Sequence, residues 1–349
     1  MSSAYHRLTI QQIRDEVPGV RSFVLAPADG QPLPYTAGQY LTLIQTQHGR
    51  DVRRSYSISS APALNEPLTI TVQRLDNGLV SRYLIDRAQV GDEIRTLGPA
   101  GFFTLPPDFA ETYTHLILLA AGSGITPIFS LLKTVLHTLP QARVLLIYSN
   151  RRPDSALFLA ELQALARQFP AQLHLELLFS QNPDLARARL HKSLLEELVA
   201  RYAPAPPSRT LAYLCGPLDY MRMGTYGLHE AGLPLANIRR ELFSPSTATV
   251  PHSIPPDTEP HTVRIEVRGQ EHEVRVQYPQ TILQAARRQA LALPYSCEAG
   301  SCGNCAAHCS QGQVWMAANE VLTDRELARG LVLTCTGYPV GTVPVKLKI

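Results

Sequence analysis

The sequence predicts a multidomain protein: an antiparallel β-barrel, then an α/β domain with a parallel sheet, then a small α+β domain. Three observations predict this order. Short alternating apolar runs fill the first part of the chain, and longer apolar runs separated by amphipathic stretches begin near His115. A proline-rich stretch then precedes a segment that holds most of the cysteines. At 349 residues, the chain is also longer than one ordinary domain.

The first predicted domain, residues 1–108, has the pattern of a small barrel. Gly, Pro, Asn and Asp separate its apolar runs, which is typical of turns between antiparallel strands. We expect one short helix at residues 80–85 and strands at residues 22–25, 40–44, 55–59, 68–74 and 93–97.

In the second predicted domain, residues 109–243, continuous apolar runs alternate with helical patterns. Such runs are typical of strands that are buried on both faces, so we expect a parallel sheet with helices on each side. The expected strands are residues 116–121, 144–148, 173–179 and 211–214, and the expected helices are residues 126–137, 157–168, 193–202 and 217–232.

Residues 244–260 are rich in proline and poor in residues that could be buried, which predicts a semi-rigid linker. The last predicted domain spans residues 261–349. We expect two strands within residues 261–276, a helix at residues 281–290, a closing strand at residues 343–349, and loops elsewhere.

The composition limits the class of partner. With 32 Lys and Arg against 29 Asp and Glu, the net charge is +3, and no dense basic stripe argues for nucleic acid. The N-terminus lacks a basic segment followed by an apolar run, and no apolar run reaches the roughly 18 residues that a membrane span needs. We therefore expect a cytoplasmic protein without a membrane span.

The most specific motif is a cysteine loop. Cys297, Cys302 and Cys305 have the spacing C-x4-C-x2-C, and Cys335 follows at a distance, which is the spacing of a plant-type two-iron two-sulfur cluster. Gly300 and Gly303 would let backbone amides approach the cluster. The alternative is a zinc site, but zinc usually takes two paired C-x2-C knuckles.

Cys309 lies outside this spacing, and we expect it to be a small buried structural residue.

Two other stretches carry candidate flavin-binding residues. Arg54 could hold a phosphate and Tyr56 could pack on a flavin ring, with Ser55 and Ser57 beside them on the same strand. Each taken alone also fits a surface charge or a packing residue. The second stretch opens the predicted helix, where free N–H groups could meet a pyrophosphate, and contains Gly78, Val80 and Ser81.

The candidate nucleotide site begins between a buried strand and a helix, where phosphate can lie on the helix N-terminus. Its loop contains Gly122, Ser123, Gly124, Thr126 and Pro127. Because Pro127 takes the last position, this is not the dinucleotide fingerprint G-x-G-x-x-G. Further candidates follow later strands or end the domain: Asn150, Arg151, Cys215, Gly216, Pro217, Glu241 and Phe243.

These motifs, together with residues 37–40 and 98–103, resemble the ferredoxin-NADP reductase superfamily. Residues 261–349, with further matches at residues 294–297, 312–316 and 333–335, look like a plant-type ferredoxin domain, which implies a β-grasp fold. The whole chain is similar to reductase components of multicomponent oxygenases, such as the phenylacetyl-CoA epoxidase reductase.

The resemblance implies that NADPH or NADH binds at residues 122–127 and delivers hydride to flavin N5. Ser57 would hydrogen-bond the reacting edge of the flavin, Cys215 would pack on the nicotinamide, and Glu241 would orient the ring or relay a proton. Without such roles, Cys215 would be a buried strand-end cysteine and Glu241 a solvated carboxylate. Single electrons would then pass through the cluster to a separate iron-containing oxygenase or hydroxylase.

Several alternatives stay open. The helix motif favours FAD, whereas the phthalate dioxygenase reductase branch has the same domain order with FMN and NADH. No acid lies within residues 148–152, which favours NADPH, although Arg151 could instead cover the adenine of NADH. A flavin and iron–sulfur redox sensor, or an enzyme that passes hydride straight to a small substrate, are the competing functions.

Overall fold

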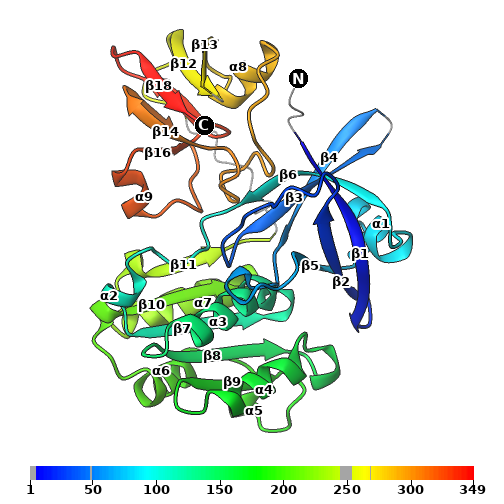
Figure 1. Ribbon diagram of the computed structural model, residues 1–349. Helices are drawn as coiled ribbons and strands as arrows, with labels where there is room; N and C mark the ends of the chain where they lie inside the picture. The colour runs from blue at the N-terminus through cyan, green and yellow to red at the C-terminus, as the bar shows by residue number, and fades with distance from the viewer. Residues whose placement is uncertain (1–4, 48, 244–253, 268) are drawn as a thin grey trace. The chain divides into compact units, whose positions relative to one another are not determined.

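The computed structural model describes residues 5–47, 49–243, 254–267 and 269–349. The chain divides into two compact units, Met1–Phe243 and Ser244–Ile349. The first contains a six-stranded antiparallel sheet and a five-stranded parallel sheet (Figure 1). The second contains a five-stranded and a two-stranded sheet.

The six-stranded sheet has the order β4-β3-β6-β1-β2-β5. Its two outermost strands meet through a bridge between Ile58 and Ile70, so the sheet closes at that point and the predicted barrel is confirmed. The strands are β1 (His6–Val17), β2 (Val20–Pro27), β3 (Tyr40–Gln47), β4 (Arg50–Ser57), β5 (Thr69–Gln73) and β6 (Glu93–Ala100). The predicted helix is α1 (Leu79–Asp86), and it is preceded by the short 3₁₀ turn η1 (Pro62–Leu64) between β4 and β5.

Strand β1 is the barrel strand that the sequence pattern did not set apart. Its pairing with β2 shifts register between Ile10 and Gln12, and such a bulge interrupts the period of two. The buried residues Leu8 and Ile10 therefore lie out of phase with Ile13 farther along the strand.

The parallel sheet has the order β11-β10-β7-β8-β9. Its strands are β7 (His115–Ala121), β8 (Arg143–Asn150), β9 (Leu173–Phe179), β10 (Thr210–Cys215) and β11 (Ile238–Glu241). The long helices are α3 (Ile125–Thr138), α4 (Leu159–Gln168), α6 (Lys192–Tyr202) and α7 (Leu218–Glu230), and the short ones are α2 (Phe109–Thr112) and α5 (Leu185–Ala188). The 3₁₀ turns are η2 (Gly122–Gly124), η3 (Pro153–Ser155), η4 (Pro207–Arg209) and η5 (Leu235–Asn237).

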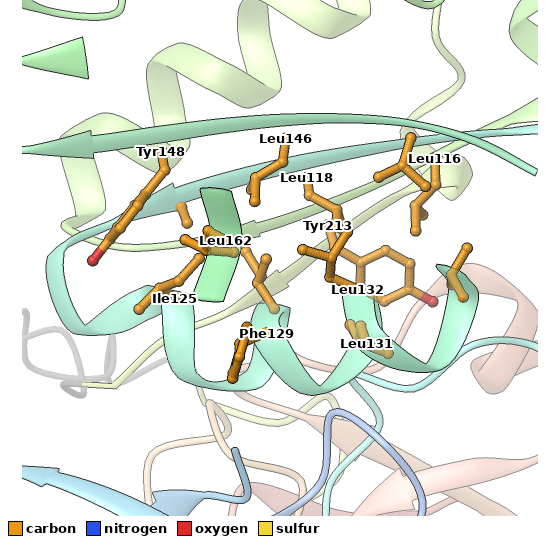
Figure 2. Close-up of a cluster of buried hydrophobic side chains, with 14 of the residues drawn as sticks. Leu116, Leu118, Ile125, Phe129, Leu131, Leu132, Leu146, Tyr148, Leu162 and Tyr213 are labelled. Atoms are coloured by element: carbon orange, nitrogen blue, oxygen red, sulfur yellow. The ribbon is translucent and has the colours of Figure 1, made fainter. Parts of the chain in front are cut away.

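Two buried clusters show that helices cover both faces of this sheet, as predicted. Alternate residues of β7 divide between the clusters: Leu116 and Leu118 pack with α3 and α4, whereas Ile117 and Leu119 pack with α6 and α7. Figure 2 shows the first cluster, in which Leu132 of α3 lies between the helix and the strands. Strand β11 was not predicted, because only Ile238 of its four residues is buried and no apolar run marks it.

In the second unit, the larger sheet has the order β13-β12-β18-β14-β16, and β15 pairs with β17. The elements are β12 (His261–Val267), β13 (Gln270–Val276), α8 (Ile282–Arg288), β14 (Ala306–Gln311), β15 (Gln313–Met316), α9 (Asp324–Ala328), β16 (Leu331–Leu333), β17 (Gly337–Val340) and β18 (Val345–Lys348). The two opening strands, the helix and the closing strand lie where we expected them. The expectation of loops elsewhere was wrong, because β14 to β17 are short and bury too few residues to show a period.

Residues 244–253 of the predicted linker lie outside the described residues. The exact domain boundaries that we predicted stay predictions. Across the part of the chain that the structure describes, no helix combines the length and the apolar character that crossing a membrane requires.

Truncation of Leu118 tests the assignment of the core. Leu118 is fully buried between β7 and α3, so Leu118→Ala should lower the free energy of unfolding by about 2–5 kcal/mol. Leu185→Ala is the matched control, because Leu185 is 82% exposed, and it should change stability by no more than about 0.5 kcal/mol. Chemical denaturation measures both, and equal effects of the two variants would contradict the described core.

Candidate functional site

The carboxyl ends of three neighbouring parallel strands meet at one edge of the sheet. Cys215, the last residue of β10, pairs with Ala120 of β7 on one side and with Glu241 of β11 on the other. In open α/β sheets, ligands bind at the carboxyl ends of the strands. Two of the three predicted catalytic residues therefore share the expected edge.

The third predicted catalytic residue reaches this edge from the barrel. Ser57 is the last residue of β4 and is buried, and its hydroxyl donates a hydrogen bond of 3.1 Å to Glu241 Oε2. The barrel strand that carries the flavin candidates thus ends beside the strand ends that carry the nucleotide candidates.

Burial controls the ionisation of this group of residues. It raises the pKa of Glu241 to about 8, although the hydrogen bond from Ser57 acts in the opposite direction. Burial also raises the pKa of the Cys215 thiol well above its usual value, and the neighbouring charge of Glu241 adds to this effect. At neutral pH, Glu241 can therefore hold or release a proton, and its side chain is half-buried rather than fully solvated. Cys215 is fully buried, as the strand-end interpretation requires, so its contact with a nicotinamide stays a prediction.

The glycine loop forms the turn η2 between β7 and α3, as the sequence predicted. A Cβ atom at Gly124 would lie 2.2 Å from the carbonyl oxygen of Cys215, so only glycine lets the loop approach β10 this closely. Thr126 donates a hydrogen bond of 3.0 Å to the carbonyl of Ser123. No side chain caps the N-terminus of α3, and a phosphate can lie at such a helix N-terminus. Pro127 lies in this first turn, where its missing N–H costs no helix hydrogen bond.

Two tyrosines that the sequence analysis did not single out hold this loop. The hydroxyl of Tyr148, at the end of β8, donates to the carbonyl of Gly122 over 3.2 Å. The hydroxyl of Tyr220, in the first turn of α7, donates to the carbonyl of Ala120 over 3.1 Å. Their positions at a strand end and just after Gly216 and Pro217 are the sequence signal that could have identified them.

The end of β8 carries the residues expected to select the nucleotide. Asn150 ends the strand, and Arg151 is exposed without an ion-pair partner among the described residues. Arg152 is paired with Asp154, with 3.0 Å between Nε and Oδ1. Asp154 is therefore an acid that follows this strand, two residues beyond the stretch 148–152 from which NADPH was predicted. Its charge is neutralised by Arg152.

The flavin candidates on β4 present a cation beside an aromatic ring. Arg54 is exposed, donates to the carbonyl of Arg53 over 2.7 Å, and has no acidic partner within the described ranges. Ser55 is exposed beside it, and its hydroxyl lies 2.9 Å from that of Thr42. Tyr56 packs against the barrel core, and burial raises the pKa of its hydroxyl. This arrangement fits a phosphate near Arg54 and a ring near Tyr56.

At the start of α1, Gly78 is the N-cap and no side chain caps the helix. Ser81 is buried, and its hydroxyl accepts from the N–H of Leu75 and donates to the carbonyl of Gly78. Val80 is buried as well. Of these three residues, only the backbone N–H groups are therefore left to meet a pyrophosphate, which fits the phosphate-bearing half of FAD.

In the second unit, four of the five cysteines form two pairs. A hydrogen bond between Cys297 and Cys302 lowers the pKa of Cys297 to about 5, and a hydrogen bond between Cys305 and Cys335 lowers the pKa of Cys305. The charge of Cys297 also acts on Cys305 and Cys335, so all four lie close together. In the described ranges, no three His, Cys or acidic side chains are arranged around a single metal ion. Two pairs fit a two-iron cluster, because each iron takes two thiolates.

The loop around these sulfur atoms supplies N–H groups, as expected. The N–H of Ala299 donates to Cys297 Sγ over 3.4 Å, and the N–H of Asn304 is directed to Cys302. A Cβ at Gly300, which has φ +74°, would lie 2.6 Å from the carbonyl of Ala318. The side-chain nitrogen of Asn304 is buried without a hydrogen-bond partner among the described residues, which fits a loop built around an acceptor such as an iron–sulfur cluster.

Cys309 departs from its expectation. It lies at a register shift in β14, is half-buried rather than buried, and its thiol is 3.3 Å from the carbonyl oxygen of Gln311.

Phe243, the last residue of the first unit, is 47% exposed, and no contact of its ring identifies a ligand.

Three family models match the chain in the predicted order. They are described as an oxidoreductase FAD-binding domain at residues 8–105, an oxidoreductase NAD-binding domain at residues 118–225, and a 2Fe-2S iron–sulfur cluster binding domain at residues 265–340. The FAD-binding match agrees with the choice of FAD over FMN.

Full-length relatives have the same architecture. The ferredoxin reductase component of 3-ketosteroid-9-alpha-monooxygenase from Mycobacterium tuberculosis is 34% identical, over 95% of this chain and 92% of that protein. The chain belongs to the ferredoxin reductase components of oxygenases. A component of 1,2-phenylacetyl-CoA epoxidase from Escherichia coli, another similar protein, is 31% identical over 97% of this chain and 96% of its own length.

A solved reductase structure also matches the whole chain. Phthalate dioxygenase reductase, described as a modular structure for electron transfer from pyridine nucleotides to [2Fe-2S], has a TM-score of 0.60 at 25% identity. The match covers 99% of this chain and 98% of that one. The predicted family and fold are thus confirmed: this oxygenase reductase is an oxidoreductase with FAD-binding, NAD-binding and 2Fe-2S domains.

The raised pKa of Glu241 predicts a pH-dependent stability. Its carboxyl has a pKa of 4.5 when unperturbed and about 8 in the folded chain. The protonated group thus stabilises the fold fully below pH 4.5, and this contribution is lost as the pH rises to about 8, by at most about 1.4 kcal/mol per pH unit. In Glu241→Gln, this contribution should be absent.

Thermal unfolding of both proteins across this pH range measures the effect. As the pH rises, the wild type should lose stability relative to Glu241→Gln. A constant difference would show that Glu241 titrates as an ordinary exposed carboxyl.

Proposed function

We propose that this oxygenase reductase takes hydride from NADPH or NADH onto FAD and passes electrons singly through its 2Fe-2S cluster to a separate oxygenase or hydroxylase. The observation that carries the proposal is the hydrogen bond between Ser57 and Glu241, which brings the flavin strand to the nucleotide edge of the sheet. The two cysteine pairs of the other unit supply the one-electron site.

The chain's own residues have distinct roles in this proposal. In this proposal, Glu241 holds a proton at Oε2 and, when it does, donates it to Ser57 Oγ, which leaves the serine hydroxyl free to donate to the reacting edge of a bound flavin. Cys215 forms the floor on which the nicotinamide packs. A bound flavin supplies the chemistry that connects these sites, because it accepts electrons in pairs and releases them one at a time.

The terminal acceptor in this proposal is a different protein. The relatives from Mycobacterium tuberculosis and Escherichia coli are named as components of a monooxygenase and an epoxidase, and they cover nearly the full length of this chain. We also predict that this chain and its partner oxygenase are both located in the cytoplasm.

NADPH is the proposed donor, because Arg151 offers a cation that no described acid neutralises at the end of β8. Arg151→Ala should weaken binding of NADPH about tenfold or more and leave NADH binding nearly unchanged. Arg152→Ala is the control, since its exposed pair with Asp154 is already satisfied. Dissociation constants from flavin-absorbance titrations measure both, and equal losses for the two nucleotides would contradict the assignment.

Stopped-flow spectroscopy of the flavin- and cluster-loaded protein tests the electron path. In the wild type, NADPH should bleach the flavin band first and the iron–sulfur band next. Cys302→Ser removes one cluster ligand, so flavin bleaching should persist while reduction of a one-electron acceptor protein such as cytochrome c falls about a hundredfold or more. Cys309→Ser is the control and should behave as the wild type.

Two results would contradict the proposal. Unchanged cytochrome c reduction in Cys302→Ser would favour direct delivery from the flavin. Negligible turnover of the wild type with all cofactors bound would favour the redox sensor.

A further inference from the structure

We propose that Lys133 and Glu66 are positioning residues for hydride transfer: the ion pair between the buried Lys133 and the half-buried Glu66 fixes α3, which carries the nucleotide loop, against the segment that follows the flavin strand. This inference rests on the proposed function, and it adds residues that neither the motifs nor the family comparison identify. Ser130 contributes a second contact of the same kind.

Lys133 is a charged residue in a buried position. It is the only Lys, Arg, Asp or Glu in α3 and is 8% exposed, with Nζ 4.3 Å from the centre of the Phe129 ring. Its ammonium group contacts Glu66 Oε2. Burial lowers the pKa of Lys133, and the hydrogen bond and charge of Glu66 act in the opposite direction. A lone lysine in an apolar helix was the sequence signal for this site.

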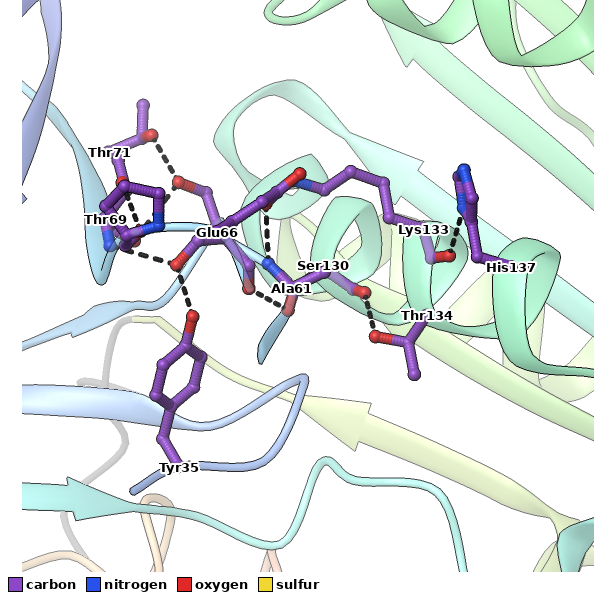
Figure 3. A network of polar contacts seen from close by, with 12 residues as sticks. Tyr35, Ala61, Glu66, Thr69, Thr71, Ser130, Lys133, Thr134 and His137 are labelled. Carbon is purple, nitrogen blue, oxygen red and sulfur yellow. Dashed lines mark hydrogen bonds and ion pairs between the residues drawn. The ribbon is translucent and has the colours of Figure 1, made fainter. Parts of the chain in front are cut away.

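Glu66 lies in the loop between β4 and β5, and the same carboxylate oxygen serves two partners. Besides contacting Lys133, Oε2 accepts a hydrogen bond of 2.7 Å from the N–H of Ala61. Figure 3 shows Glu66 between the backbone of this loop and the lysine that extends from α3. The carboxylate therefore connects the loop backbone to the helix.

A second contact lies one helical turn nearer the start of α3. Ser130 is fully buried, and its hydroxyl donates to the carbonyl of Ser60 over 2.5 Å. The hydroxyl of Ser60 is in turn 2.7 Å from the hydroxyl of Tyr35, and it accepts from the N–H of Thr69 over 2.9 Å. The helix is thus attached at two points to a loop that the barrel itself holds in place (Figure 3).

Both attached segments lead directly to the proposed reaction site. Ser60 follows Ser57 by three residues, and α3 starts immediately after Gly124 of the nucleotide loop. The separation between the flavin contact and the nucleotide loop therefore depends on how α3 sits against residues 60–66. Hydride transfer is sensitive to this separation, because a misplacement of about 1 Å can cost about a hundredfold in rate.

Apolar packing also joins α3 to the barrel, but it fixes the position of the helix less precisely than the ion pair and the hydrogen bond do. Ala37 and Phe103 of the barrel belong to the same buried cluster as Leu131 of α3. Such contacts are non-directional, so they tolerate sliding. The ion pair and the hydrogen bond each have one favourable geometry, and removing Glu66 alone would leave the ammonium group of the buried Lys133 without a compensating charge. We therefore test the pair by neutralising both members.

The test variant is Lys133→Met/Glu66→Gln, which removes both charges and keeps an amide oxygen for Ala61. Lys192→Met is the matched control: Lys192 also pairs with glutamates, at 3.7 Å from Glu196 and 3.5 Å from Glu230, and lies 5.3 Å above the Tyr226 ring, but on α6. Lys133→Arg restores the charge. Each is prepared as the full-length, cofactor-loaded protein.

The first measurement is the rate constant of flavin bleaching at saturating NADPH. We expect a loss of about 10- to 100-fold in the double variant, with flavin affinity and the dissociation constant of NADPH changed less than about threefold. Lys133→Arg should recover most of the rate, and Lys192→Met should match the wild type. A wild-type rate in the double variant would overturn the proposal.

The second measurement is hydrogen–deuterium exchange of the protein without nucleotide. Exchange of backbone amides in residues 58–66 should be faster in the double variant and unchanged in Lys192→Met. Unchanged exchange in both would also overturn the inference. Should the wild type itself fail to transfer hydride, the proposed function fails, whereas a wild-type result in the double variant alone removes only the positioning role.

Discussion

The hydrogen bond from Ser57 to Glu241 joins the last residue of a barrel strand to the last residue of an edge strand in the parallel sheet, over 3.1 Å. Two different sheets therefore present their strand ends at one place. A two-electron transfer needs donor and acceptor in contact, and side chains from both sheets are required to arrange that contact. The remaining features of the first unit hold this junction in one geometry.

Removing a charged group from water costs free energy, and the first unit limits this cost in two ways. Cys215 is fully buried and Glu241 is half-buried, and the loss of solvent raises the pKa of both groups, so both favour their neutral forms. Lys133 is instead paired with the carboxylate of Glu66. The cysteine loop of the second unit uses a third solution, in which backbone N–H groups such as that of Ala299 are directed at sulfur.

Features encoded in a contiguous stretch were predictable from the sequence. The cysteine spacing, the strand and helix around Gly122–Gly124, and the helix at Leu79–Asp86 each depend on neighbours in the chain. The missed features depend on tertiary contacts. Strand β11 has one buried residue and is held by pairing with β10, and the partner of Lys133 is 67 residues away in sequence. Short strands such as Leu331–Leu333 are too brief to show a period, so their pairing with β14 could not be inferred.

The central claim is that one chain converts hydride into single electrons. An anaerobic titration with NADPH, followed by visible absorption and by electron paramagnetic resonance of the reduced cluster, tests it most directly. A flavin that accepts two electrons and a cluster that accepts one should consume about 1.5 equivalents of NADPH per chain, with both absorption bands bleached. An endpoint near one equivalent with the iron–sulfur band still oxidised would contradict the account, because the cluster would then lie outside the electron path.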